Sequence, residues 1–150
     1  MLTPRTDHLI DLALDEDAGL GDVTSRAIFS PRHTSRAFIE AGHDLTVCGS
    51  EIAARVFVRV DPALAVKLVA RDGDRVKKGG KVLTVSGPTA ALLTAERTAL
   101  NFIQRLSGVA TLSRKFADAV AGTGVRVVDT RKTTPGWRAL EKYAVRSAVA

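Results

Sequence analysis

Two adjacent cations follow a run of valines near the end of the chain, in the stretch VRVVDTRKTTPGW. Arg131 presents a planar guanidinium that matches a carboxylate or phosphate in two-point contact, and Lys132 adds a compact point charge. Thr130 supplies a hydroxyl beside them. Because adjacent cations repel each other, the pair favours an anion with more than one charge. A basic surface loop paired with Asp129 fits the spacing equally well.

The residues on either side predict that these cations lie at the carboxyl end of a buried parallel strand. Val125, Val127 and Val128 form a near-continuous apolar run, which is typical of a strand covered on both faces. A helix is expected from near Pro135 or Gly136, so that strand, loop and helix make one β-α unit. In α/β barrels and open parallel sheets, ligands bind where loops leave the carboxyl ends of strands.

The stretch PTAALLTAERTALNFIQRLSG predicts a helix over residues 89–107, capped by Thr89 and ended by Gly108. Its apolar stripe contains Leu92, Ala99, Leu100, Ile103 and Leu106. Glu96 falls in the middle of that stripe, where an unpaired carboxylate would be costly to bury, and Arg97 lies at its margin. The two residues therefore predict either an ion pair or part of a site. A second helix is expected to follow, ended by the Gly-Thr-Gly at 122–124.

Helical and strand patterns alternate through the first part of the chain. A helix ending at Gly19 is expected to have an apolar side made of Leu9, Ile10, Leu12 and Ala13. Short strands are expected over 34–41 and 45–48, and Ser50 is a suitable N-cap for another helix. Residues 64–87 alternate apolar and polar types, which predicts a hairpin-rich sheet with one solvated face.

The composition excludes several classes of function. The chain has 150 residues and a net charge of +6, which favours an anionic partner. Its basic residues are dispersed and only 5% of residues are aromatic, which argues against nucleic acid. Cys48 is the single cysteine, and the three histidines lack the spacing of a helical metal site. No apolar leader or membrane-length apolar run is present, so a cytoplasmic setting without a membrane partner is expected.

Three motifs together resemble the quinolinate phosphoribosyltransferase family: EDAGLGDVTS, ERTALNFIQRLSGVAT and DTRKTTPGWRALEKYAV. The resemblance covers about residues 7–146. DTRKT alone is less specific, since related nicotinate phosphoribosyltransferases have similar loops. The resemblance implies that phosphoribosyl pyrophosphate and quinolinate react, with magnesium, to give nicotinate mononucleotide, pyrophosphate and carbon dioxide in NAD biosynthesis.

The resemblance also implies a fold and roles for four residues. Arg131 and Lys132 would bind the carboxylates of quinolinate with Thr130 beside them, and Arg97 would reach the active site of the neighbouring subunit of a homodimer. No catalytic residue and no metal ligand is assigned within this chain. The implied fold is an α+β N-terminal sandwich over residues 1–108, followed by the first β-α unit of an incomplete α/β barrel over residues 109–150.

The chain departs from the family pattern at its end. A barrel needs about 200 residues or more, and the motif expected after KYAVR, a glycine-rich loop with Asn-His-Arg, is replaced by SAVA. Loss of one nucleotide from codons for Cys-Gly-Gly-Gly would give Ser-Ala-Val-Ala, which predicts either an interrupted reading frame or a sequencing error. A truncated chain with little activity alone is therefore expected, with loosely held residues from about 122 onward.

Three alternatives stay open from the sequence. The chain could be a non-catalytic dimerisation or interaction fragment that uses the helix at 89–107, or a relative that acts on another pyridine carboxylate. The hairpin pattern of VARDGDRVKKGGKVLTVSG is similar to that of biotinyl and lipoyl carrier domains. Lys77, Lys78 and Lys81 lie in an ordinary basic turn, however, which disfavours a carrier role.

Overall fold

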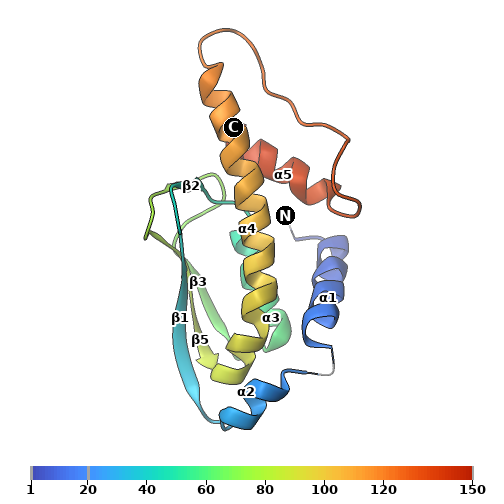
Figure 1. Ribbon diagram of the computed structural model, residues 1–150, viewed down its shortest axis with the longest axis vertical. Helices are drawn as coiled ribbons and strands as arrows, with labels where there is room; N and C mark the ends of the chain where they lie inside the picture. Colours follow the sequence, from blue (N-terminus) through green and yellow to red (C-terminus); the bar gives the residue numbers. More distant parts are fainter. Residues whose placement is uncertain (1, 20, 150) are drawn as a thin grey trace.

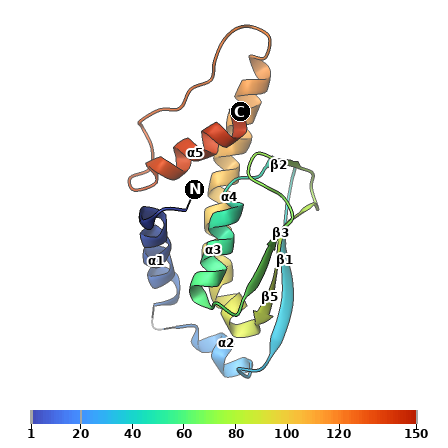
Figure 2. The same cartoon turned by 180° about the vertical axis from the view of Figure 1, so that it is seen from behind.

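The computed structural model describes residues 2–19 and 21–149. Figures 1 and 2 show a long central helix with a sheet on one side and the N-terminal helix on the other. In chain order the elements are α1 (Pro4–Ala18), α2 (Val23–Ile28), β1 (Thr34–Glu40), β2 (Leu45–Thr46), α3 (Ser50–Val60), β3 (Ala65–Leu68), β4 (Arg75–Val76), β5 (Lys81–Pro88), α4 (Thr89–Ala119) and α5 (Arg138–Val149). The expected mixed α and β architecture is confirmed, with no closed barrel in the described residues.

The main sheet is antiparallel, with β5 between β1 and β3. Ala37 and Leu68 flank β5 opposite Val85 and Leu83, respectively. β2 and β4 make a separate two-stranded ribbon. Helices α3 and α4 pack together and contact the main sheet, so the buried apolar side chains lie between a helical layer and a strand layer. Burial of these side chains is the main source of stability for such a sandwich.

Helix α4 is continuous over 31 residues, so the predicted break at Gly108 is wrong. A glycine inside a helix costs only about 1 kcal/mol relative to alanine. The buried side of α4 continues past the glycine, from Leu106 and Ser107 to Ala110, and this burial outweighs the cost. The predicted domain boundary at 108 therefore falls inside one helix, and the boundary itself stays a prediction.

The buried stripe of α4 is rotated relative to the predicted stripe. Ala95 and Phe102 are buried on it, Leu100 is half-buried, and Glu96 is exposed. The prediction that Glu96 lies within the apolar stripe is therefore wrong, and its carboxylate stays in water. Similarly, Leu12 of α1 is 53% exposed and does not belong to the apolar side of that helix, where Ile10 is fully buried.

The predicted strand at Val125–Val128 is not formed. Residues 125–130 have no regular secondary structure, and the side chains of Val125 and Val128 are 62% and 78% exposed. A parallel strand needs a hydrogen-bonded neighbour, and none of the strands described between residues 34 and 88 pairs with this segment. The helix of the predicted β-α unit does form, as α5.

Helix α5 packs across α4, although it lies in the region that was expected to be loosely held (Figures 1 and 2). Leu140, Ala144 and Ala148 are buried at this contact. Ala150, the last residue of the SAVA end, lies outside the described residues. Across residues 2–19 and 21–149, no helix combines the length and the apolar character needed to cross a bilayer.

Candidate functional site

The segment Thr130–Lys132 presents its two cations to solvent. All three residues are exposed, and the hydroxyl of Thr130 accepts a 3.2 Å hydrogen bond from the backbone N–H of Lys132. Within the described residues, the side chains of Arg131 and Lys132 have no ion-pair partner. The two charges are therefore available to an external anion.

Asp129 does not neutralise these cations. Its Oδ1 accepts a 2.6 Å hydrogen bond from Nζ of Lys142 on α5. The alternative in which the basic loop pairs with its own Asp129 is therefore wrong. The nearest carboxylate in the sequence is already paired, which preserves the positive potential around Arg131 and Lys132.

The residues that follow Lys132 are hydrogen-bonded to, or packed against, α5 and α4. Both carboxylate oxygens of Glu141 accept hydrogen bonds from Thr134: Oε1 from the hydroxyl at 2.8 Å and Oε2 from the backbone N–H at 3.3 Å. Arg105 of α4 donates to the same Oε1 at 2.7 Å and to the Thr134 hydroxyl at 3.0 Å. Trp137 stacks on Phe102 of α4 with a ring separation of 4.9 Å.

The Glu141 side chain is only 12% exposed, and the groups around its carboxylate favour the charged form. Burial alone would raise its pKa, but the hydrogen bonds from Arg105 and Thr134 outweigh burial and lower the pKa below its ordinary value. Sequence reasoning did not single out Glu141, Lys142 or Arg105. The one available signal was the adjacent Glu-Lys pair in LEKYAV, one helical turn after Trp137.

Arg97 lies elsewhere on the molecule. Its NH1 donates a 2.6 Å hydrogen bond to Asp17 near the end of α1, and the Arg97 side chain is 73% exposed. The contact with Asp17 raises the pKa of the guanidinium. Arg97 also lines a hollow of about 580 Å³ that includes Asp22, Thr94 and Glu96. Asp22 is itself engaged, since it accepts hydrogen bonds from the backbone N–H and the hydroxyl of Ser25.

The structure thus brings together three of the four predicted site residues. Thr130, Arg131 and Lys132 are contiguous, whereas Arg97 contacts α1, and no described contact joins it to the cationic segment. Since one guanidinium nitrogen is paired with Asp17 and most of the side chain is in water, Arg97 retains donors for another partner.

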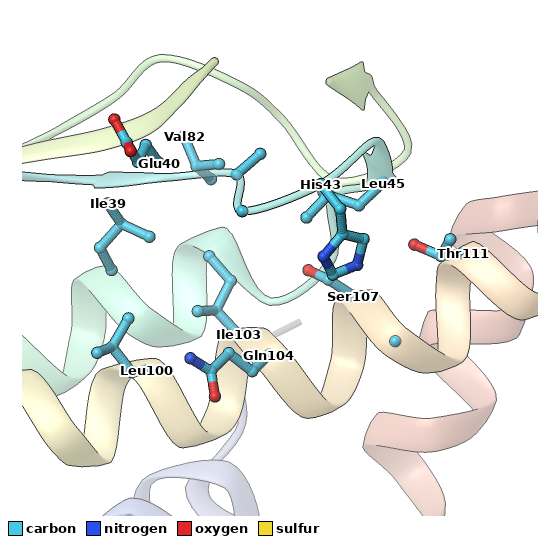
Figure 3. A pocket seen from close by; sticks show the side chains of 13 residues that line it. Ile39, Glu40, His43, Leu45, Val82, Leu100, Ile103, Gln104, Ser107 and Thr111 are labelled. Carbon is cyan, nitrogen blue, oxygen red and sulfur yellow. The ribbon is translucent and has the colours of Figure 1, made fainter. Parts of the chain in front are cut away.

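A second hollow, of about 410 Å³, lies between α4 and the chain around the end of β1 (Figure 3). Its lining is mainly aliphatic and includes Ile39, Leu45, Val82, Leu100 and Ile103. Figure 3 shows the carboxylate of Glu40 directed away from α4. This hollow offers no cluster of cations and does not match the anion that the exposed Arg-Lys pair predicts.

Two family models match consecutive parts of the chain. The quinolinate phosphoribosyl transferase N-terminal domain matches residues 22–107, and the C-terminal domain of the same family matches residues 109–149. A "Quinolinate phosphoribosyltransferase [decarboxylating] 1" of Nicotiana glauca is 44% identical over 138 residues, which is 91% of this chain and 39% of that protein. A "Probable nicotinate-nucleotide pyrophosphorylase [carboxylating]" of Bacillus subtilis is 43% identical over 132 residues, 88% of this chain and 45% of that protein.

Solved structures of similar proteins have the same fold. NadC from Streptococcus pyogenes superposes with a TM-score of 0.95 at 37% identity, covering 100% of this chain and 54% of that chain. The nicotinate-nucleotide pyrophosphorylase from Francisella tularensis gives a TM-score of 0.92 at 32% identity, over 99% of this chain and 54% of that chain. The chain therefore spans less than half the length of the two curated relatives and about half of each solved chain.

Proposed function

The chain belongs to the quinolinate phosphoribosyltransferase family, and from this premise we propose that its Thr130–Lys132 segment binds the two carboxylates of quinolinate. The reaction served is phosphoribosyl transfer from phosphoribosyl pyrophosphate with loss of carbon dioxide, which gives nicotinate mononucleotide in NAD biosynthesis. Because the chain spans 39–45% of the curated relatives, we assign it one wall of the substrate site rather than the whole reaction.

The observation that supports this assignment is the pair of unneutralised cations beside a hydroxyl. Asp129, the carboxylate next to them in sequence, is engaged by Lys142, so Arg131 and Lys132 face water without a partner in the described residues. Arg131 offers a fork for one carboxylate and Lys132 a point charge for the other. Fixed cations of this kind also stabilise negative charge that develops on a ring as carbon dioxide leaves.

We assign Arg97 to the quinolinate site of a second subunit in a homodimer. Its exposure of 73% and its contact with α1 support a role outside its own Thr130–Lys132 segment. A cytoplasmic location is part of the same proposal, in keeping with the single reduced cysteine, Cys48.

Magnesium is implied by the family resemblance, and no residue of this chain is assigned to it. Among residues 2–19 and 21–149, no group of three or more histidine, cysteine, aspartate or glutamate side chains could hold a metal ion. No step of the proposal therefore passes through the metal.

The binding assignment is tested with isotope-labelled chain of the present length, titrated with quinolinate or with nicotinate, which has one carboxylate. We expect quinolinate to shift the backbone amide resonances of residues 130–132 and to bind more tightly than nicotinate. Replacing both Arg131 and Lys132 by glutamine should weaken quinolinate binding by about a hundredfold or more, since each of the two charge-assisted contacts contributes about 1.5–3 kcal/mol. Equal quinolinate affinity in the double variant would overturn the proposal.

The reaction itself is tested in a chain extended through the rest of the family's C-terminal domain. Nicotinate mononucleotide formation from quinolinate and phosphoribosyl pyrophosphate is the readout. We expect the Arg131→Gln, Lys132→Gln variant of the extended chain to lose activity at low quinolinate concentration. The unextended chain, assayed beside it, reports whether the present segment has any activity alone.

A further inference from the structure

We propose that Glu141 and Lys142, two consecutive residues of α5, are positioning residues that hold both ends of the quinolinate-binding segment Thr130–Lys132. The inference rests on the proposed function and deepens it. Neither residue is assigned a contact with substrate. Each acts through a residue next to the cations, Asp129 on one side and Thr134 on the other.

The first anchor lies directly before the segment. Nζ of Lys142 donates to Oδ1 of Asp129 at 2.6 Å, and the two side chains are 32% and 23% exposed. This ion pair has two consequences for the cations. It fixes the backbone one residue before Thr130, and it occupies the carboxylate that would otherwise be the closest competitor for Arg131.

The second anchor lies two residues after Lys132. Glu141 accepts from both the hydroxyl and the backbone N–H of Thr134, so it holds the main chain as well as the side chain. Arg105 joins the same carboxylate from α4 and also reaches the Thr134 hydroxyl. The Glu141 side chain is 12% exposed, and its carboxylate accepts three hydrogen bonds. This contact therefore stabilises the segment more than a fully exposed ion pair would.

The segment depends on these anchors because it has no strand pairing of its own. Residues 125–130 lack regular structure, and Val125 and Val128 are largely exposed. Helix α5, which carries Glu141 and Lys142, is by contrast well packed. Helix α5 buries Leu140 and Ala144 against its neighbours, and Tyr143 donates a 2.9 Å hydrogen bond to Asp72. Sites held by packed elements keep binding groups in place better than free loops do.

The test compares Lys142→Met, which removes the first anchor, with Lys142→Arg, which keeps a cation and hydrogen-bond donors there. In the 150-residue chain, the backbone order of residues 130–132 is measured by heteronuclear relaxation, and quinolinate affinity by amide shifts. We expect Lys142→Met to lower the order of the segment and to weaken quinolinate binding about fivefold, within the range of a partly exposed ion pair. Lys142→Arg should restore most of both properties.

Lys77→Met is the matched control, because it removes the same charge from an ion pair with Asp44 on a different part of the surface. It should leave the order of residues 130–132 unchanged. Thr134→Val probes the second anchor without altering α5, and should lower the order of the segment as Lys142→Met does. This variant also keeps the inference testable if Lys142→Met unfolds.

The outcomes separate the two proposals. If the parent chain binds quinolinate and Lys142→Met binds it equally with an equally ordered segment, the positioning inference is wrong and the proposed function stands. If the parent fails to bind quinolinate, the proposed function fails, and the relaxation data still decide whether the anchors order the segment. Loss of net charge alone weakens the binding of the doubly charged quinolinate more than that of nicotinate. The affinity ratio of quinolinate over nicotinate therefore supports positioning only if it falls further in Lys142→Met than in Lys77→Met, which removes the same charge.

Discussion

Oη of Tyr143 on α5 donates a 2.9 Å hydrogen bond to Oδ2 of Asp72, in the loop between β3 and β4. The other oxygen of Asp72 accepts from the backbone N–H and the hydroxyl of Ser50, at 2.9 and 2.6 Å. One carboxylate therefore joins α5 to the first residue of α3. A negative charge is favourable there, because unpaired backbone N–H groups point out of a helix N-terminus.

Removing the Tyr143 hydroxyl should cost modest stability. In Tyr143→Phe, Asp72 keeps its two bonds from Ser50, so we expect the free energy of unfolding to fall by about 1 kcal/mol, the usual value of one hydrogen bond. Asp72→Ala should cost about 2–3 kcal/mol, since it also leaves the buried Ser50 without its acceptor. Urea unfolding followed by circular dichroism measures both. Equal losses in the two variants would contradict the bridging role of Asp72.

The same contact predicts a loss of stability at high pH. Burial, followed by the hydrogen bond and the negative charge of Asp72, raises the pKa of Tyr143 to about 12 from an ordinary value of 10.0. The phenol therefore contributes stability that is fully present below pH 10, and this contribution is lost as the pH rises through about 12. Tyr143 is the only tyrosine, so the ultraviolet absorbance of the phenolate reports this group alone.

The comparison variant for the alkaline titration is Asp72→Asn. It removes the charge that opposes phenolate formation, so the pKa of Tyr143 should fall towards its ordinary value while burial keeps it raised. Tyr143→Phe should lack the stability change between pH 10 and 12 that this group causes in the parent chain. A phenolate that titrates at its ordinary pKa in the folded parent would show that α5 is not docked on Asp72 in solution.

Position 49, just before α3, requires a glycine because of both its backbone conformation and the side chain packed against it. Its φ is +91°, in the left-handed region, and an added Cβ would lie 2.8 Å from Cδ1 of the buried Leu106. We expect Gly49→Ala to lower the free energy of unfolding by about 2–3 kcal/mol, from backbone strain together with overpacking. Gly42→Ala is the control, because nothing lies within 4 Å of its Cβ position, and it should change stability little.

The regular elements could largely be predicted because each is dictated by a local pattern of burial. The buried apolar residues of α3, Ile52 and Phe57 among them, recur at helical spacing, and the alternation over 64–87 forms three strands. The valine run at 125–128 does not form a strand, because an apolar run forms a buried strand only when a partner strand is present. Gly108 does not end its helix, because burial of the residues beyond it outweighs the local cost of a glycine.

The candidate site could be predicted in part for a similar reason. Residue type alone predicts that Arg131 and Lys132 bind an anion, and their exposure is compatible with that role. The ion pair that keeps Asp129 from neutralising them joins it to Lys142, 13 positions away, and Arg105 reaches the Glu141 carboxylate across 36 positions. The contact with Arg105 exists only once α5 has docked on α4, so the local sequence pattern does not reveal it.

Arg97 allows a role in binding to be separated from a role in folding. An exposed ion pair contributes about 0–1 kcal/mol, so Arg97→Ala should leave the free energy of unfolding nearly unchanged. In the extended chain, Arg97→Ala should nevertheless reduce nicotinate mononucleotide formation, because we assign Arg97 to the quinolinate site of a second subunit. Asp17→Asn decides between the two roles: if Arg97 serves only to pair with Asp17, both variants will have the same small effect on activity. A large loss of activity confined to Arg97→Ala, restored when that variant is mixed with a Lys132→Gln chain that retains Arg97, would support a site shared between subunits.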